Sequence, residues 1–189
     1  RPEGPVTSAL CWSHARRGFY ELADIAAKAR RGSAAAVSPI ALEAVKRIDA
    51  IFALEREING RSPEERARAR QEPAKPLVDD LATWLQAQRG TLSRSAAVAK
   101  PIDYMLKRWD RFAAFLDDGR ICLTNNAAER ALRGFALGRK AWLFAGSDRG
   151  GERAAFVYSL IGTAKLNDAD PQAWLADVLA RIADIPQSR

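Results

Sequence analysis

The sequence predicts a mainly helical protein of one domain, with at most two or three short strands. Apolar residues recur every three or four positions over most of the 189 residues, which is the period of an amphipathic helix. Glycines and prolines fall between these periodic segments, where helices begin and end. Only two short apolar runs, Val6–Trp12 and Ile121–Leu123, are typical of strands.

The composition is that of an ordinary globular protein with a strongly basic balance. Hydrophobic residues make up 48% of the chain, and the formal net charge is +7. A positive charge of this size favours a polyanionic partner, with nucleic acid first. Two cysteines provide no disulfide framework and indicate a reducing compartment, and no apolar run is long enough to span a bilayer. We therefore expect a cytoplasmic protein that is associated with the nucleoid when it binds DNA.

The first residues predict a strand followed by a helix. A Gly-Pro break precedes Val6–Trp12, and Ser13 stands at the N-cap of a helix that runs from His14 to about Arg31. The segment before the strand lacks the apolar stretch of a signal peptide, and the chain does not begin with Met. We therefore expect further sequence upstream of residue 1.

The middle of the chain predicts a series of helices and no strand. Ser38-Pro39 starts a helix that ends at Asn59-Gly60, and Ser62 with Glu65 forms a capping box for the next helix. That next helix is rich in arginine and poor in apolar residues, so we expect it to lie in solvent until prolines kink or break it. The arginines are Arg66, Arg68 and Arg70, and the prolines are Pro73 and Pro76. The next apolar face contains Leu77, Leu81, Trp84 and Leu85. A further helix is predicted from near Ser95 to Gly119, and its apolar face contains Ile102, Met105, Leu106, Trp109, Phe112, Ala113 and Leu116.

Three helices are predicted after Ile121–Leu123. Asn126 caps the first, which runs to about Leu137, and Ala145–Gly151 forms a turn before the second. Asp170-Pro171 starts the third. The residues expected to face inward are Ala128, Leu132, Phe135 and Ala136 in the first helix, Ala154, Val157, Tyr158, Ile161 and Ala164 in the second, and Trp174, Leu175, Val178, Leu179 and Ile182 in the third.

Glu129 is the carboxylate with the most specific setting, and two interpretations of it stay open at this point. In the first it belongs to a capping box, in which Asn126 accepts from the backbone N–H of residue 129 and Glu129 accepts from that of Asn126. In the second it is a ligand of a hard divalent cation such as Mg²⁺, which prefers oxygen ligands. A two-ion site that acts on phosphodiesters needs several carboxylates, so Glu129 would need partners from elsewhere. The spacing alone favours the cap.

Basic residues gather close to Glu129 in the sequence. They either remain solvated surface charge or contact phosphate, which arginine binds through two parallel hydrogen bonds. The density of positive charge in so short a span favours phosphate contact. The set is Arg130, Arg133, Arg139, Lys140, Arg149 and Arg153. The nearby Trp142 and Phe144 are suited to stacking on bases, but aromatic residues are more typical of a core.

Two other motifs give weaker signals. Gly146–Gly151 looks like a phosphate loop but lacks the Gly-Lys-Ser/Thr ending, so an ordinary turn explains it better. Cys11 and His14 have a Cys-x-x-His spacing, yet a structural zinc site needs four ligands and the chain has one histidine. A Cys–His hydrolase is also disfavoured, because no third group is evident that would orient the pair.

Several segments, taken in order, resemble one known family. The sequence LTNNAAERALR at residues 123–133 and GRKAWLFAGS at residues 138–147 closely resemble the C-terminal part of the bacterial DDE transposases of the insertion-sequence sixty-six type. The sequences CWSHARR at residues 11–17 and TAKLN at residues 163–167, followed by Asp170-Pro171, resemble further segments of that family. The resemblance spans almost the whole chain.

The resemblance implies an RNase H-like catalytic core, in which two Asp and one Glu bind two divalent metal ions and drive DNA strand cleavage and joining. Glu129 matches the third acid, so the resemblance makes it a catalytic residue and a ligand of Mg²⁺ or Mn²⁺. Residues 1–13 would hold the last core strand, residues 14–118 a helical insertion, and residues 119–189 the helix of the catalytic Glu and the C-terminal helices. DNA and self-association in a transposition complex are the partners implied.

The chain departs from the family in one respect. The family's two catalytic Asp residues lie upstream of the Cys-Trp-x-His segment, where this chain has ten residues and no Asp. Asp24, Asp49 and Asp79 lie on helical patterns and do not match. We therefore expect a truncated transposase that is inactive alone and does not bind Mg²⁺ tightly. A non-catalytic basic helical module that binds DNA or regulates a full-length relative is the alternative, and a purely structural helical protein is the third.

Overall fold

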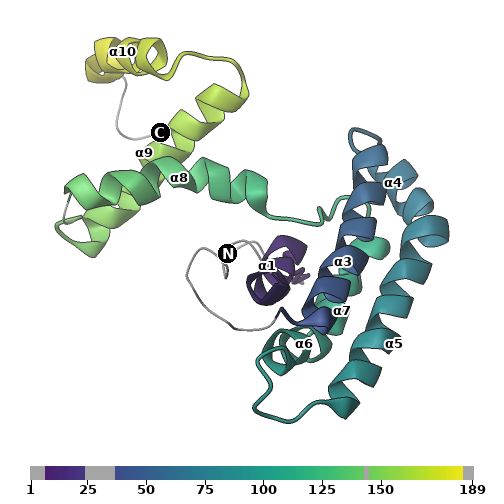
Figure 1. The fold of residues 1–189 in the computed structure, drawn as a ribbon. Helices are drawn as coiled ribbons and strands as arrows, with labels where there is room; N and C mark the ends of the chain where they lie inside the picture. The colour runs from purple at the N-terminus through teal and green to yellow at the C-terminus, as the bar shows by residue number, and fades with distance from the viewer. Residues whose placement is uncertain (1–6, 24–36, 143–144, 185–189) are drawn as a thin grey trace. The chain divides into compact units, whose positions relative to one another are not determined.

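The protein is built from helices, as predicted. The computed structural model describes residues 7–23, 37–142 and 145–184, and every regular element within them is a helix (Figure 1). The chain divides into two compact units, Arg1–Asn125 and Asn126–Arg189. Over the same described ranges, no helix combines the length and the apolar character needed to cross a membrane.

The two predicted strands are wrong where the structure describes them. Thr7–Cys11 has no regular secondary structure, and Trp12 begins helix α1 (Trp12–Ala23) instead of ending a strand. Residues 121–123 form no strand either. The two segments share a backbone hydrogen bond, in which the Trp12 N–H donates to the Leu123 carbonyl at 3.0 Å. A strand requires a repeated ladder of such bonds, and the described part of these segments does not form one.

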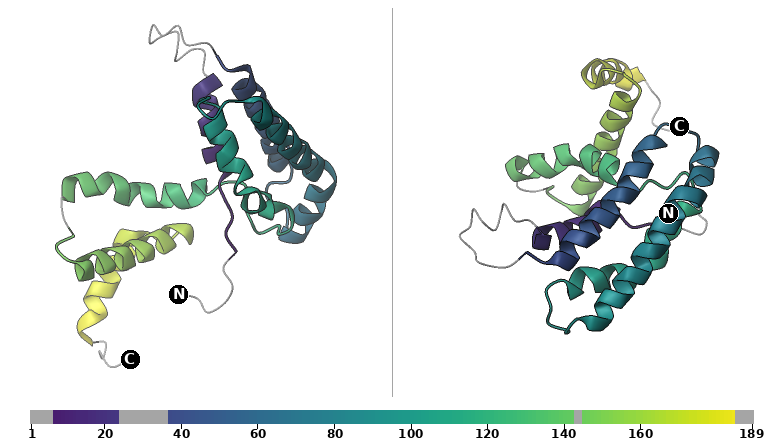
Figure 2. Two further views of the ribbon diagram at one scale, coloured as in Figure 1. Left: turned by 90° about the horizontal axis from the view of Figure 1, so that it is seen from below. Right: turned by 45° about the vertical axis from the view of Figure 1, so that its right-hand side comes forward.

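The described residues of the first unit form seven further elements. They are α3 (Pro39–Glu57), α4 (Pro63–Ala69), the π-helical turn η1 (Arg70–Ala74), α5 (Lys75–Thr91), α6 (Ala99–Leu106), α7 (Trp109–Ala113) and the 3₁₀ turn η2 (Ala114–Leu116). Helix α3 packs against both α1 and α5, and α6 contacts α1 and α5 in turn (Figures 1 and 2). The single helix predicted from Ser95 to Gly119 is therefore three short elements, because the chain turns at Lys107 and Arg108.

Trp12 lies at the centre of the core of the first unit. Its ring makes edge-to-face contacts with Trp109, Phe112 and Phe115, with centroids 5.7–6.1 Å apart. Its indole N–H donates to the Phe112 carbonyl at 3.0 Å, so the one polar atom of this buried ring has a partner. The predicted apolar stripes supply the rest of the core, including Phe19, Ile48, Leu81, Leu85, Ile102 and Met105.

Local helix signals were predicted well. The Ser38 hydroxyl accepts from the Ala41 N–H, and Ser62 and Glu65 form both hydrogen bonds of the capping box. Asp170 likewise accepts from the Gln172 N–H at the start of α10 (Pro171–Arg181). The predicted cap at Ser13 is wrong, since α1 already includes Trp12.

The arginine-rich segment differs from its prediction in two ways. Pro73 does not break the helix, because a π-helical turn absorbs the missing N–H and the chain continues into α5. Arg70 does not lie in solvent: its exposed fraction is 0%. It lies beneath the turn formed by residues 115–121, to which its guanidinium donates hydrogen bonds.

Gly119 marks the closest approach in this region. It is buried, and a Cβ at this position would overlap the backbone carbonyl of Pro63 at the start of α4. We expect Gly119→Ala to lower the free energy of unfolding by about 3 kcal/mol, because backbone cannot move aside as a side chain can. Gly90→Ala in α5 meets no atom and is expected to raise it by about 0.5–1 kcal/mol. Chemical denaturation measures both, and equal effects would contradict the packing at Gly119.

The second unit contains α8 (Asn126–Trp142), α9 (Asp148–Leu166), α10 and the 3₁₀ turn η3 (Ile182–Asp184). Helix α8 runs five residues beyond its predicted end, and α9 begins inside the predicted turn, so the turn before it is shorter. The left-handed backbone of Gly146 makes that turn, and the Ser147 hydroxyl caps α9 by accepting from the Gly150 N–H.

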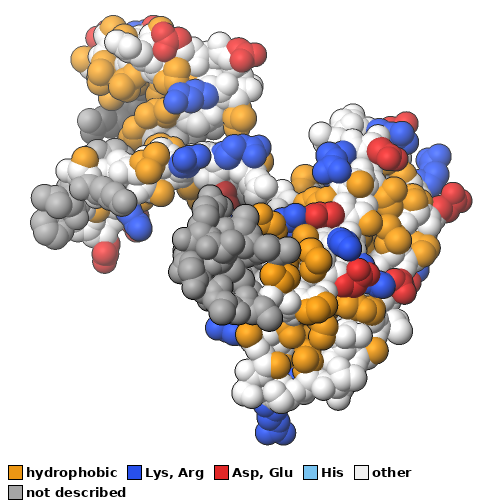
Figure 3. All heavy atoms as spheres, viewed as in Figure 1, with side chains coloured by type: hydrophobic (Ala, Val, Ile, Leu, Met, Phe, Trp, Pro, Cys, Tyr) orange, Lys and Arg blue, Asp and Glu red, His pale blue; other side chains and the backbone are white. Residues whose placement is uncertain are grey.

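The residues predicted to face inward in this unit are less buried than expected. None of its described residues is buried, and Leu132 of α8 is 60% exposed. Figure 3 shows hydrophobic side chains on the surface of this unit. Helices α8 and α9 do touch, because the Tyr158 hydroxyl donates to the Ala131 carbonyl at 2.6 Å and its ring packs against Phe135. The apolar faces are helical stripes, as predicted, but the described residues of the unit cover them only in part.

Candidate functional site

Glu129 lies in the first turn of α8. Strong helix formers around it, Ala127, Ala128 and Ala131, favour a helix that starts directly after the polar residues Thr124 and Asn125. The helix begins at Asn126, so the cap position falls on Asn125, one residue before its prediction and within the usual spread of helix boundaries. The side chain of Glu129 is exposed on the helix surface.

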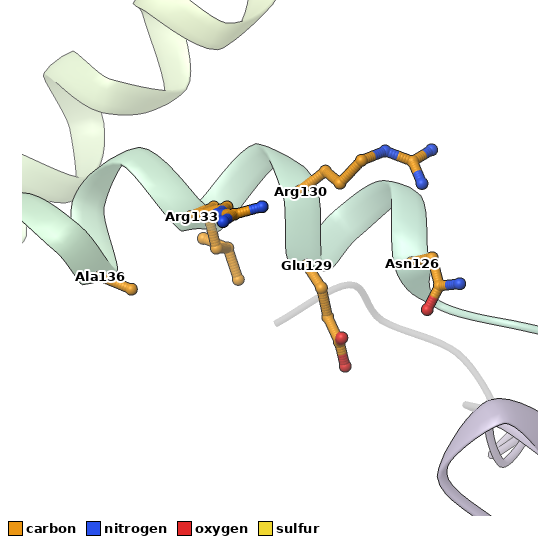
Figure 4. Close-up of a pocket in the computed structure, with 6 residues that line it drawn as sticks. Asn126, Glu129, Arg130, Arg133 and Ala136 are labelled. Carbon is orange, nitrogen blue, oxygen red and sulfur yellow. The ribbon is translucent and has the colours of Figure 1, made fainter. Parts of the chain in front are cut away.

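A shallow hollow on α8 brings Glu129 together with two of the predicted basic residues. It is lined by Asn126, Glu129, Arg130, Leu132, Arg133 and Ala136, all from this one helix (Figure 4). Figure 4 shows the Glu129 carboxylate and the Arg130 guanidinium leaving opposite sides of the helix. The hollow therefore offers an acidic group and, around the helix from it, cations that can reach a phosphate.

The other predicted basic residues do not line this hollow. Arg139 is exposed further along α8, while Arg149 and Arg153 are exposed one turn apart on α9. The side chains of Lys140 and Trp142 and the whole of Phe144 lie outside the described residues, so base stacking stays a prediction. The structure thus divides one dense basic stretch into two helix surfaces.

Leu132 and Ala136 are the lining residues that the sequence misassigned. Both were expected to face a core, but they lie open beside Glu129. Their spacing of three and seven residues from Glu129 already places them on its side of a helix. The sequence does not show whether another element covers this face of α8, and in the described part of the unit none does.

Glu129 alone does not fit a complete divalent-metal site. Among the residues that the structure describes, no three Asp, Glu, His or Cys side chains come close enough to hold one ion. Mg²⁺ prefers near-octahedral oxygen coordination with carboxylates and water, so further acids would have to come from outside this set.

Several acids of the first unit are already paired with cations. Asp49 on α3 accepts from Arg16 at 2.6 Å, and Asp79 on α5 accepts from Lys75 at 3.2 Å. Hydrogen bonds from the Arg120 side chain, and then from its backbone N–H, lower the pKa of Asp118 to about 2. As predicted, Asp49 and Asp79 lie on helices, while Asp24 lies outside the described residues.

The sequence matches two family descriptions that together cover most of the chain. Residues 2–153 match "Transposase IS66 family", and residues 159–189 match "IS66 C-terminal element". The first match contains α1 to α8 and the start of α9, and so includes Glu129 and all of the predicted basic residues. No solved structure matches this chain.

Longer bacterial proteins are similar to this chain. The uncharacterized protein y4hP of Sinorhizobium fredii is 62% identical over 187 residues, which is 98% of this chain and 34% of that protein. The uncharacterized protein y4jD of the same organism is 41% identical over 178 residues, 94% of this chain and 33% of that protein. The chain therefore spans about a third of the length of these relatives. On the family match and this similarity, the chain belongs to the IS66 transposase family.

Proposed function

We propose that this chain is the C-terminal part of a DDE transposase that cleaves and joins DNA strands, and that Glu129 is its third catalytic acid. The observation that carries the proposal is the exposed carboxylate in the first turn of α8, inside the family match and beside Arg130 and Arg133. An RNase H-like core would be completed by sequence of the kind that makes up the other two thirds of the longer relatives.

The residues of this chain would supply part of the chemistry. Mg²⁺ or Mn²⁺ supplies Lewis-acid activation in two-metal DNA enzymes. Glu129 would hold one such ion together with acids from elsewhere, while Arg130, Arg133, Arg139, Lys140, Arg149 and Arg153 would neutralise DNA phosphates. Self-association in a DNA complex, in the cytoplasm and on the nucleoid, belongs to the same proposal.

A non-catalytic DNA-binding or regulatory module is the second candidate. Two observations favour it: no three metal-ligand side chains come together among the described residues, and the chain has a net charge of +7. The two candidates differ in whether a longer protein that contains this region processes DNA.

The test is a strand-joining assay on a chimera in which this chain replaces the matching 187 residues of y4hP. The DNA carries the ends that flank the y4hP gene. We expect the chimera to join these ends in Mg²⁺ or Mn²⁺ and to lose the activity when EDTA removes the metal, because the attacking oxygen needs metal activation. The isolated chain should be inactive. Joining that persists in EDTA, or a chimera that binds the ends without processing them, would overturn the catalytic proposal.

A further inference from the structure

A second basic hollow lies on the first unit, at the turn between α6 and α7. Its lining residues are Lys107, Arg108, Asp110 and Arg111, and all four are exposed. None of the three cations belongs to the basic set around Glu129. We infer that this hollow binds the phosphate backbone of duplex DNA, as a contact separate from the surface of α8. The inference rests on the proposed function, which supplies DNA as the polyanion.

The charges of this hollow are available to a ligand. Over the described residues, Lys107, Arg108 and Arg111 form no hydrogen-bonded ion pair with a carboxylate. Lys107 interacts through its charge alone with Asp103, whose pKa is lowered first by the hydrogen bond from Arg89 and then by the charges of Arg89 and Lys107. Other arginines of the same unit are neutralised: Arg16 binds Asp49, Arg47 binds Glu43, Arg89 binds Asp103 and Arg120 binds Asp118. The unit therefore pairs many of its surface cations but leaves three within five residues unpaired, and unpaired cations gain most from a phosphate.

The backbone beneath the hollow is held in place by groups that lie about a hundred residues away in the sequence. The Leu10 N–H donates to the Arg111 carbonyl at 3.1 Å, and the Trp12 indole N–H donates to the neighbouring Phe112 carbonyl at 3.0 Å. Phe112 itself is buried in the aromatic cluster around Trp12. A fixed turn loses little conformational entropy when it binds, which favours affinity.

Tyr104 orients one of the three cations. The Arg108 guanidinium lies 5.0 Å from the centre of the Tyr104 ring and donates to the Tyr104 carbonyl at 3.4 Å. A guanidinium that stacks on a ring keeps its other N–H groups free for the paired hydrogen bonds that arginine makes with phosphate. Arg108 is thus positioned before a ligand arrives.

Asp110 selects among possible anions. Asp110 lines the same hollow, and its negative charge repels an anion that binds near it. A single free phosphate would meet this repulsion at full strength, whereas a DNA backbone can place successive phosphates against Lys107, Arg108 and Arg111 and leave Asp110 between them. The acid therefore favours an extended polyanion over an isolated one.

The test measures binding of the full chain to a fluorescently labelled DNA duplex at several salt concentrations. One variant changes Lys107, Arg108 and Arg111 to Ala. Its matched control changes Lys46, Arg56 and Arg94 to Ala. These are exposed cations of the same unit without a described ion pair. We expect the hollow variant to bind at least about tenfold more weakly and to lose about three from the slope of log K against log salt. The control should lose clearly less of both.

Asp110→Asn provides a test of opposite sign that removes no cation. It should tighten DNA binding severalfold, while the thermal unfolding temperature stays unchanged. This variant therefore tests the inference even if the triple variant does not fold. Equal losses in the hollow variant and its control, or no tightening by Asp110→Asn, would overturn the inference while leaving the proposed function standing. If the wild-type chain bound no duplex, the inference and the second candidate function, a DNA-binding module, would fail, while strand joining by the chimera would still test the catalytic proposal. If transfer RNA displaced the duplex at equal concentration, DNA would be the wrong ligand.

Discussion

Replacing Arg70 with alanine is expected to lower the free energy of unfolding by about 3–5 kcal/mol, the range for removing one member of a buried ion pair. The Arg70 side chain is 0% exposed, and all five of its N–H groups are positioned to donate. Two bind the Glu55 carboxylate at 2.6 and 2.8 Å. The other three bind the carbonyls of Phe115, Asp118 and Ile121 at 2.6, 3.2 and 3.1 Å.

Alanine at this position would harm the fold in two ways. The Glu55 carboxylate, with 10% of its side chain exposed, would keep a single cation among the described residues, the more distant Arg66, 3.6 Å away. Three backbone carbonyls of the turn at 115–121 would also lose their donor, and a buried acceptor without one costs about 1–3 kcal/mol. This turn leads to Leu123, whose carbonyl accepts from Trp12 at the centre of the core.

Urea unfolding followed by tryptophan fluorescence measures the effect, since Trp12 and Trp109 lie in this unit. Arg120→Ala is the matched control, because Arg120 also pairs with a carboxylate but is 80% exposed. An exposed pair contributes less than about 1 kcal/mol, so the control should change little. Similar losses in the two variants would contradict the buried role of Arg70.

The double variant Arg70→Met, Glu55→Leu separates the ion pair from the carbonyl contacts. Replacing a buried pair with apolar residues of similar size is often close to neutral. Here it should recover only part of the loss, because methionine offers nothing to the three carbonyls. Full recovery would mean that the hydrogen bonds to the turn do not matter.

Arg70 also shows where sequence patterns stop being informative. The caps at Ser38, Ser62 and Asp170 were predictable because each accepting oxygen and its donor lie within three residues. The partners of Arg70 in the turn lie 45 to 51 residues away in the sequence. The periodic pattern does not include them, so it predicts that an arginine on a weakly apolar helix is exposed to solvent. The predicted strands failed for the same reason, since a strand depends on a neighbour that its own sequence does not specify.

In the candidate sites, too, residues close in the sequence were predictable and those that depend on distant contacts were not. Asn126, Glu129 and Arg133 lie together because they are three, four or seven residues apart on one helix, and the sequence shows that spacing directly. Arg130 follows Glu129 in the chain and leaves the helix on the other side. The basic hollow at 107–111 escaped notice because its residues stand between two strong apolar stripes and were counted as part of one helix. Its shape depends on the chain turning there and on Leu10, which is distant in the sequence.

Glu129→Gln in the chimera with y4hP is expected to reduce strand joining by at least about a hundredfold, because even the outer partners of metal ligands contribute 10–100-fold. Glutamine has nearly the same shape as glutamate but lacks the negative charge with which a carboxylate binds a divalent cation strongly. DNA affinity should not fall, and the free energy of unfolding should stay within about 0.5 kcal/mol, as for other exposed positions. Glu152→Gln, an exposed glutamate on α9, is the control and should leave joining unchanged.

This substitution also separates the two interpretations of Glu129 that the sequence left open. Glutamine serves as well as glutamate in a capping box, since either side chain accepts the hydrogen bond from the backbone N–H. If Glu129 only caps α8, both activity and stability should survive the change to glutamine, and Glu129→Ala should instead lower stability by about 1 kcal/mol. If Glu129 is the third acid of a metal site, glutamine should abolish joining while the fold remains intact. Retained joining in the glutamine variant would therefore refute the catalytic assignment and leave α8 as a capped, basic DNA-binding helix.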